Sequence, residues 1–158
     1  MAENTNASES MNRARNETDT TLHFTGEFAA QLAALEAGVT AEELEAIAAL
    51  PSGSALLIVR RGPNMGARFL LDSDSTLAGR HPEADIFLDD VTVSRRHASF
   101  TRRGTTFEVT DHGSLNGTYF DGVRVESAVL SDGAEVQVGK FRLTFYPSRL
   151  DVVAATGE

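Results

Sequence analysis

From residue 54 onward the chain repeats short runs in which apolar and polar positions alternate. Residues 55–59 form a continuous apolar run, and 68–71 follow it after a Gly-Pro-Asn-Met-Gly turn. Runs of this length between turn residues are typical of β-strands. Four more candidate strands follow later in the chain, at 97–101, 106–110, 135–138 and 141–145.

Turn residues separate these runs. Asp121-Gly122 and Asp132-Gly133 are hairpin signals, and Gly104 lies between two of the candidate strands. About ten short strands, with no convincing helix after Ser54, predict an all-β fold, either a β-sandwich or a barrel, over residues 54–146. In such folds the loops at one end of the sheets carry the function.

The two ends of the chain have a different pattern. Residues 1–19 are polar, so we expect them to be disordered. Thr40 and Glu43 form a capping box before a short helix. We therefore expect residues 1–53 to be a flexible N-terminal tail with short helices, and residues 147–158 to be a disordered C-terminal tail. The tail's first helix is predicted by apolar residues at helical spacing, namely Phe24, Phe28, Leu32 and Leu35.

Composition limits the classes of function. The net charge is −9, which argues against sequence-independent binding to nucleic acid. The chain has no Cys, so disulfides and thiolate metal sites are excluded. No segment carries the apolar run that a membrane span or a signal peptide needs. We expect a cytoplasmic protein that binds neither nucleic acid nor membrane.

Three loop segments carry side chains that suit a single ligand. Arg80 and Arg95 offer planar, permanently charged donors for a phosphate dianion, and Ser94 adds a hydroxyl donor. Asn116 has an amide donor and an acceptor, which suit the backbone of an extended peptide. Together these groups meet the needs of a phosphopeptide. The segments are Gly79-Arg80-His81-Pro82, Val93-Ser94-Arg95-Arg96-His97 and Gly113-Ser114-Leu115-Asn116-Gly117-Thr118.

This set of residues, in this order, resembles the signature of the forkhead-associated (FHA) domain, and the resemblance covers roughly residues 54–146, about the whole β-region. It implies an eleven-stranded β-sandwich that binds phosphothreonine peptides through loops at one end. In that arrangement Arg80 and Ser94 bind the phosphate, Arg95 assists, and Asn116 holds the peptide backbone. Five further residues shape the site without contacting the phosphate, namely Gly79, His97, Ser114, Gly117 and Thr118.

The chain is also similar to the GarA/OdhI group of small actinobacterial regulators, whose members carry a twin-threonine motif before an FHA domain. Thr20 and Thr21 lie where that motif is expected. The resemblance implies that the unphosphorylated protein binds and inhibits the E1 component of 2-oxoglutarate dehydrogenase. Some members also act on glutamate dehydrogenase and glutamate synthase. Ser/Thr kinases of the PknB and PknG type end that binding. Around the pair this chain differs from the group at Asp19, Leu22 and His23.

The position of the two threonines suggests a switch. Phosphorylation of Thr20 or Thr21 adds roughly −1.5 to −2 charges. Thr21 precedes Ser54 by 33 residues (54 − 21), and a flexible chain of that length spans roughly 30 Å, so the tail can reach its own FHA loops. The phosphorylated tail would then close the site to other partners. The second hypothesis is an FHA adaptor that recruits phosphothreonine proteins in trans.

The same chain admits other interpretations. Ser94, His97 and Asp111 suggest a hydrolase triad, but no nucleophile elbow surrounds the serine, so we do not predict an enzyme. Three acidic residues suggest a metal loop but lack its spacing and its glycine, so neither a metal nor another cofactor is expected. Those residues are Asp85, Asp89 and Asp90. Arginine pairs at 60–61, 95–96 and 102–103 are interpreted as solvated strand edges, apart from phosphate binding by Arg95.

Overall fold

The computed structural model describes residues 38–156, and the chain divides into two compact units, Met1–Glu45 and Ala46–Glu158. The boundary at Ser54 between the tail and the β-region stays a prediction. Three predictions lie outside the described residues: the disordered segment 1–19, the threonines Thr20 and Thr21, and the apolar stripe from Phe24 to Leu35.

Helix α2 (Ala41–Ala48) begins at the predicted capping box. The backbone N–H of Thr40 donates to Oε1 of Glu43 at 3.0 Å, and the N–H of Glu43 donates to Oγ1 of Thr40 at 3.1 Å. The two bonds satisfy backbone donors that the first helical turn leaves without an intrahelical partner. The predicted capping box is confirmed.

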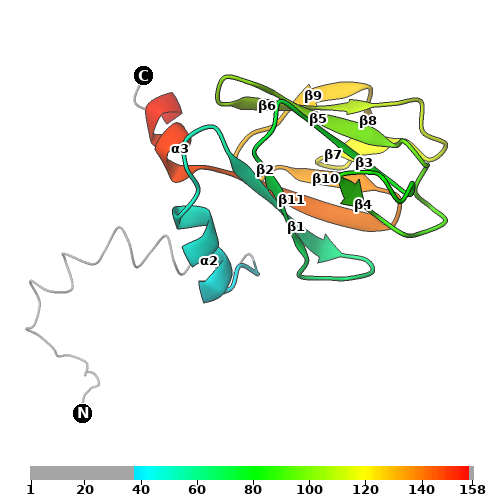
Figure 1. Ribbon diagram of the computed structural model, residues 1–158, viewed down its shortest axis with the longest axis horizontal. Helices are drawn as coiled ribbons and strands as arrows, with labels where there is room; N and C mark the ends of the chain where they lie inside the picture. The colour runs from blue at the N-terminus through cyan, green and yellow to red at the C-terminus, as the bar shows by residue number, and fades with distance from the viewer. Residues whose placement is uncertain (1–37, 157–158) are drawn as a thin grey trace, which may run out of the picture. The chain divides into compact units, whose positions relative to one another are not determined.

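The described residues form eleven strands in two sheets, which confirms the predicted β-sandwich (Figure 1). All pairings are antiparallel except that of β3 with β4. In spatial order the first sheet holds β2 (Arg68–Leu71), β1 (Ala55–Arg61), β11 (Phe141–Pro147), β10 (Glu135–Val138), β7 (Thr118–Phe120) and β8 (Val123–Val125). The second holds β4 (Ile86–Phe87), β3 (Ser75–Gly79), β5 (Ala98–Arg103), β6 (Thr106–Asp111) and β9 (Ser127–Val129).

The core fills the space between the sheets. Strand β11 shows the rule, because Phe141, Leu143 and Phe145 are buried while the residues between them are half-buried. From the opposite sheet Phe107 meets Phe145 edge to face, with ring centroids 5.5 Å apart. Alternate residues of the strand therefore point into the core, and the residues between them point outward.

The C-terminal segment is ordered where we expected a disordered tail. Helix α3 (Arg149–Thr156) follows β11. The hydroxyl of Ser148 donates to the carbonyl of Leu50 at 2.9 Å, and the Asp151 carboxylate accepts the N–H of Gly53 at 2.8 Å. These bonds join residues almost a hundred positions apart, and a local hydrophobic pattern carries no sign of them. The expectation of disorder over 149–156, and of no helix after Ser54, was wrong.

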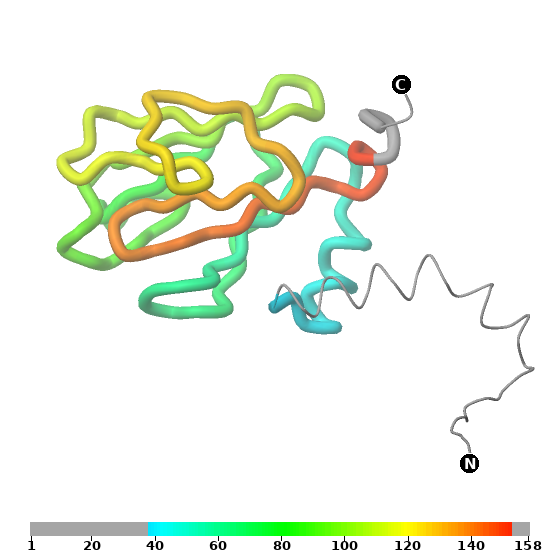
Figure 2. The backbone as a smooth tube through the Cα atoms, turned by 180° about the vertical axis from the view of Figure 1, so that it is seen from behind, coloured from blue at the N-terminus to red at the C-terminus, as the bar shows by residue number. Residues whose placement is uncertain are grey.

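Strands β3 and β5 connect two distinct ends of the sandwich (Figures 1 and 2). At one end the Arg102 guanidinium donates to the carbonyl of Gly53 at 2.8 Å and to Asp74 at 3.0 Å. At the other end the N–H of Arg80 donates to the carbonyl of Ser94 at 2.9 Å. The three predicted site loops therefore lie at the end of the sandwich opposite Gly53.

Candidate functional site

Strand β3 ends at a position that only glycine fits. Just beyond it, the N–H groups of Arg80 and His81 donate to the carbonyls of Ser94 and Arg95, at 2.9 and 3.2 Å. A Cβ on Gly79 would lie 2.8 Å from the carbonyl carbon of Arg95, closer than real Cβ atoms approach. The missing side chain lets the first two site loops share backbone hydrogen bonds.

His97 joins the second loop to the third. Its ring is fully buried, Nδ1 accepts the N–H of Ser94 at 3.0 Å, and Nε2 lies 2.8 Å from the carbonyl of Gly117. Because Nδ1 is the acceptor, the ring proton belongs on Nε2, which donates to Gly117. Burial lowers the pKa of His97, while the bond to Gly117 and the charge of Asp111 oppose that shift. A neutral imidazole therefore holds the two loops together.

The carboxylate of Asp111 organises the third loop. Its Oδ1 accepts the hydroxyls of Ser114 and Thr118, at 2.5 and 2.7 Å, and its Oδ2 accepts the N–H groups of Gly113 and Ser114, at 2.9 and 3.1 Å. The Ser114 hydroxyl also accepts the N–H of Gly117 at 2.9 Å. Burial opposes ionisation, but these hydrogen bonds outweigh it and hold the pKa of Asp111 below its usual value. The charged carboxylate thus fixes the loop from inside.

Side chains of the predicted site complete the connection. The N–H of Leu115 donates to the hydroxyl oxygen of Ser94 at 3.0 Å. The amide Nδ2 of Asn116 donates to the carbonyl of Thr92 at 3.0 Å. In consequence Ser94 and Asn116, which are 22 positions apart in sequence (116 − 94), belong to one hydrogen-bonded surface.

The outward groups of this surface are cationic and apolar. Arg80 and Arg95 are exposed and make no ion pair with any described residue, although Nε of Arg80 donates to the carbonyl of Val93 at 3.0 Å. Val91 and Leu115 precede Thr92 and Asn116, which share a hydrogen bond, and they have 86% and 84% of their surface exposed. Guanidinium groups without an ion-pair partner, together with exposed apolar side chains, suit an anionic group that is carried on a peptide chain.

The structure thus brings Arg80, Ser94, Arg95 and Asn116 to one end of the sandwich. The five residues predicted to shape the site contact the same loops: Gly79, His97, Ser114, Gly117 and Thr118. The sequence interpretation missed the central role of Asp111. The spacing Asp-x-x-Ser, typical of a side chain that bonds its own turn, was the available signal.

The geometry does not support a hydrolase triad. His97 bonds the backbone N–H of Ser94 and not its hydroxyl. The carboxylate of Asp111 is occupied by the loop residues Ser114, Thr118 and Gly113. Neither His97 nor Asp111 therefore acts as a general base toward the Ser94 hydroxyl, which instead accepts a hydrogen bond from the N–H of Leu115.

Neither a metal site nor a membrane span was found in residues 38–156. The acidic residues at 85, 89 and 90 do not converge, and no group of three His, Cys, Asp or Glu side chains in this part could hold an ion. Asp85 accepts the N–H of Leu77 at 2.9 Å, and Asp90 accepts the N–H of Thr92 at 2.9 Å. None of the helices described there has the length and apolar character needed to cross a bilayer.

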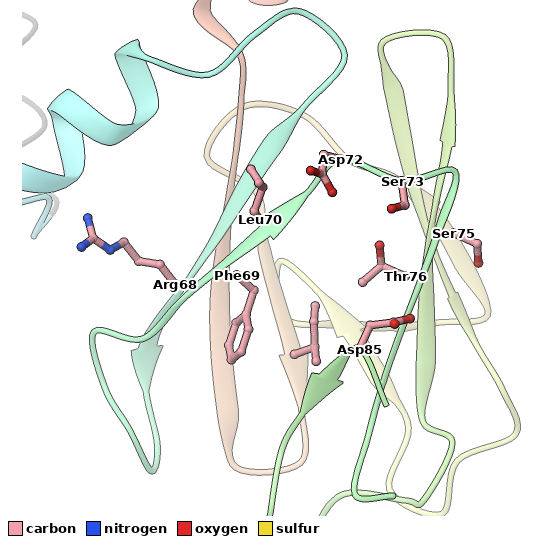
Figure 3. Close-up of a pocket in the computed structure, with 9 residues that line it drawn as sticks. Arg68, Phe69, Leu70, Asp72, Ser73, Ser75, Thr76 and Asp85 are labelled. Atoms are coloured by element: carbon pink, nitrogen blue, oxygen red, sulfur yellow. The ribbon is translucent and has the colours of Figure 1, made fainter. Parts of the chain in front are cut away.

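An open groove of about 320 Å³ lies elsewhere, between strand β2 and strand β3 (Figure 3). Phe69 and Thr76 line it, together with Asp72 and Asp85. None of the four predicted binding residues contributes to its wall. The loop surface is the stronger candidate, because it gathers two exposed arginines that make no ion pair with a described residue, whereas the groove has one arginine, Arg68, together with the carboxylates of Asp72 and Asp85.

The buried imidazole makes a pH dependence testable. The unfolded chain protonates His97 near pH 6.5, whereas the folded chain resists protonation because burial lowers its pKa. The free energy of unfolding should therefore fall as the pH drops below about 6.5. The contribution of His97 to that fall should end below the pKa of His97 in the folded state. Asp90 and Asp111, whose pKa values are lowered, lose their contribution only at more acidic pH, below about 4.

Urea unfolding of the wild type and of His97→Gln between pH 7.5 and pH 5 would check this expectation. The variant should be less stable at pH 7.5, and its free energy of unfolding should change less with pH across the window. Parallel curves for the two proteins would contradict the assignment.

Comparison with known proteins agrees with the fold. The FHA domain family model matches residues 76–139. Glycogen accumulation regulator GarA of Mycolicibacterium smegmatis is 58% identical over 127 residues, 80% of each chain. The oxoglutarate dehydrogenase inhibitor of Corynebacterium jeikeium is 67% identical over 96 residues, 61% of this chain and 67% of that protein.

A solved FHA domain, from a study of phosphothreonine-dependent interactions, aligns with a TM-score of 0.55 and 28% identity. The alignment covers 59% of this chain and 95% of that one. An FHA domain is a phosphopeptide-binding module and not an enzyme. Because the match to GarA extends over four fifths of both chains, this chain belongs to the FHA-domain family of GarA and the oxoglutarate dehydrogenase inhibitors.

Proposed function

We propose that this protein is a phosphothreonine-binding regulator that, when unphosphorylated, binds and inhibits the E1 component of 2-oxoglutarate dehydrogenase. The observation that carries the proposal is the single surface on which Arg80, Ser94, Arg95 and Asn116 meet. Relatives named as oxoglutarate dehydrogenase inhibitors support the choice of target. Glutamate dehydrogenase and glutamate synthase are further targets to test.

Each side chain has a role that fits its surroundings. Arg80 and Ser94 bind the phosphate of phosphothreonine, since the first is an unpaired exposed cation and the second presents a hydroxyl. Arg95 adds a second cation. Asn116 holds the peptide backbone with its amide oxygen, or with Nδ2 once that group releases the carbonyl of Thr92. Asp111 and His97 keep these groups in place before the ligand arrives.

Phosphorylation of Thr20 or Thr21 by a PknB- or PknG-type kinase then supplies an internal ligand. Thr21 precedes Ala41, the first residue of helix α2, by 20 residues (41 − 21). A flexible chain of that length would span roughly 25 Å. Strand β3, with five residues, covers about 17 Å of the distance between the two ends of the sandwich. The tether is therefore long enough, and it gives an effective concentration on the order of millimolar.

An inhibition assay on purified 2-oxoglutarate dehydrogenase from the source organism tests the switch. The unphosphorylated chain should inhibit the enzyme in a saturable way. The chain phosphorylated at Thr20 or Thr21 should need about a hundredfold higher concentration or more, because a micromolar ligand tethered at millimolar concentration fills the site. The kinase-treated double variant Thr20→Ala, Thr21→Ala is the control and should still inhibit.

Equal inhibition by the phosphorylated and unphosphorylated chains would contradict the switch. Binding only to dehydrogenase that is itself phosphorylated would contradict the proposal in favour of an adaptor acting in trans.

A further inference from the structure

Arg124 of strand β8 lies against the loop that carries Asn116. Strands β7 and β8 are antiparallel, with Tyr119 paired to Arg124. Gly117 immediately precedes β7 and lies two residues before Tyr119, which places it diagonally across from Arg124. A Cβ on Gly117 would lie 2.6 Å from Nε and 2.9 Å from Cζ of Arg124. The guanidinium is therefore packed directly on the backbone next to Asn116.

This guanidinium has no anionic partner. Arg124 is exposed, and its side chain makes no ion pair or hydrogen bond with any residue that the structure describes. Glu126, which follows the last residue of β8, does not form an ion pair with Arg124. By contrast, four other arginines are each paired with an acidic side chain: Arg102, Arg103, Arg142 and Arg149. A cation held by packing and left unpaired suits an incoming carboxylate.

The chain's own tail shows what such a ligand looks like. Glu17 and Asp19 lie within four positions before Thr21, whereas residues 22–25 contain no acidic side chain. Resting on the proposed function, we infer that Arg124 binds a second anionic group of the ligand, a carboxylate close to the phosphothreonine. The site then selects acidic phosphothreonine peptides, and in the tail the carboxylate is that of Asp19 or Glu17.

Fluorescence anisotropy with the full-length unphosphorylated chain tests this inference. The probes are peptides of residues 14–26, phosphorylated at Thr20 or at Thr21, each with its natural acids or with Glu17→Gln and Asp19→Asn. Wild-type protein should bind the acidic peptide about three- to fivefold more tightly than the neutral one, as expected for a partly exposed ion pair. The Arg124→Gln variant should bind both peptides with one affinity, the weaker one that the wild type has for the neutral peptide.

Arg68→Gln is the matched control, because it removes the same charge from an exposed position on β2, the opposite edge of the same sheet. It should retain the wild-type preference for the acidic peptide. The inference would be overturned if Arg124→Gln lost the same factor of affinity for both peptides and so kept the preference for the acidic one. It would also be overturned if the variant lost no affinity at all. Absence of binding by the wild type to any phosphopeptide would instead count against the proposed function itself.

Discussion

Replacing Arg80 by alanine is expected to weaken binding of a phosphothreonine peptide by about ten- to a hundredfold. A charge-assisted hydrogen bond to phosphate contributes about 1.5–3 kcal/mol, and each 1.4 kcal/mol is a factor of ten. Nε of Arg80 donates to the carbonyl of Val93, which orients the guanidinium. Isothermal titration calorimetry of wild type and variant measures the loss.

Two controls separate this effect from a general loss of charge or fold. Arg103→Ala removes a cation of the β5–β6 hairpin, at the far end of the sandwich, and should leave the affinity within about twofold, since its pair with Glu108 is a surface ion pair. Arg80→Lys keeps the charge but loses the planar fork, so its affinity should lie between those of wild type and Arg80→Ala. Unchanged affinity in Arg80→Ala would contradict the assigned role.

Replacing Gly79 by alanine is expected to cost about 3 kcal/mol or more of folding stability and to remove peptide binding. The added Cβ would clash with the carbonyl of Arg95 and come within 3.2 Å of that of Ser94. These are backbone atoms, so the loop cannot yield by rotating a side chain, and overpacking of this kind is severe. The loop that carries Ser94 must move away from Arg80. Chemical denaturation measures the stability loss.

Gly122→Ala is the matched control for that variant. Gly122 has a φ of 87° but nothing within 4 Å of an added Cβ. Alanine at this position should therefore cost only the backbone strain of a positive φ, about 1–2 kcal/mol of folding stability. Gly122→Ala should keep phosphopeptide affinity while Gly79→Ala loses it. Equal stability losses, with binding intact in both variants, would show that the close approach at Gly79 does not position the site.

Much of the sandwich was predictable because inward and outward positions alternate. The strands β2 and β10 have the bounds that the apolar pattern indicated, and β1, β5, β6 and β11 differ only at their ends. The edge strands β8 and β9 have three residues each and are mostly exposed, so no hydrophobic periodicity marked them. Helix α3 was missed because hydrogen bonds to residues 50–53 hold it, not an apolar stripe of its own.

The site divides in the same way. Arg80, Ser94, Arg95 and Asn116 were visible in the sequence because their chemistry and their order are unusual as a set. The geometry that unites them was not visible. His97 reaches Gly117 across 20 positions, and which nitrogen of its ring carries the proton depends on the N–H of Ser94. Contacts between distant residues that depend on the tertiary fold leave no local pattern.

Calorimetric titration of the unphosphorylated full-length chain with peptides of its own residues 14–26 tests whether the loop surface binds phosphothreonine. We predict saturable binding in about the micromolar range for the peptide phosphorylated at Thr20 or Thr21, and no measurable binding for the unphosphorylated peptide. Circular dichroism on the same sample verifies the β-sandwich. No heat from either phosphopeptide, with the fold intact, would contradict phosphothreonine binding by this surface.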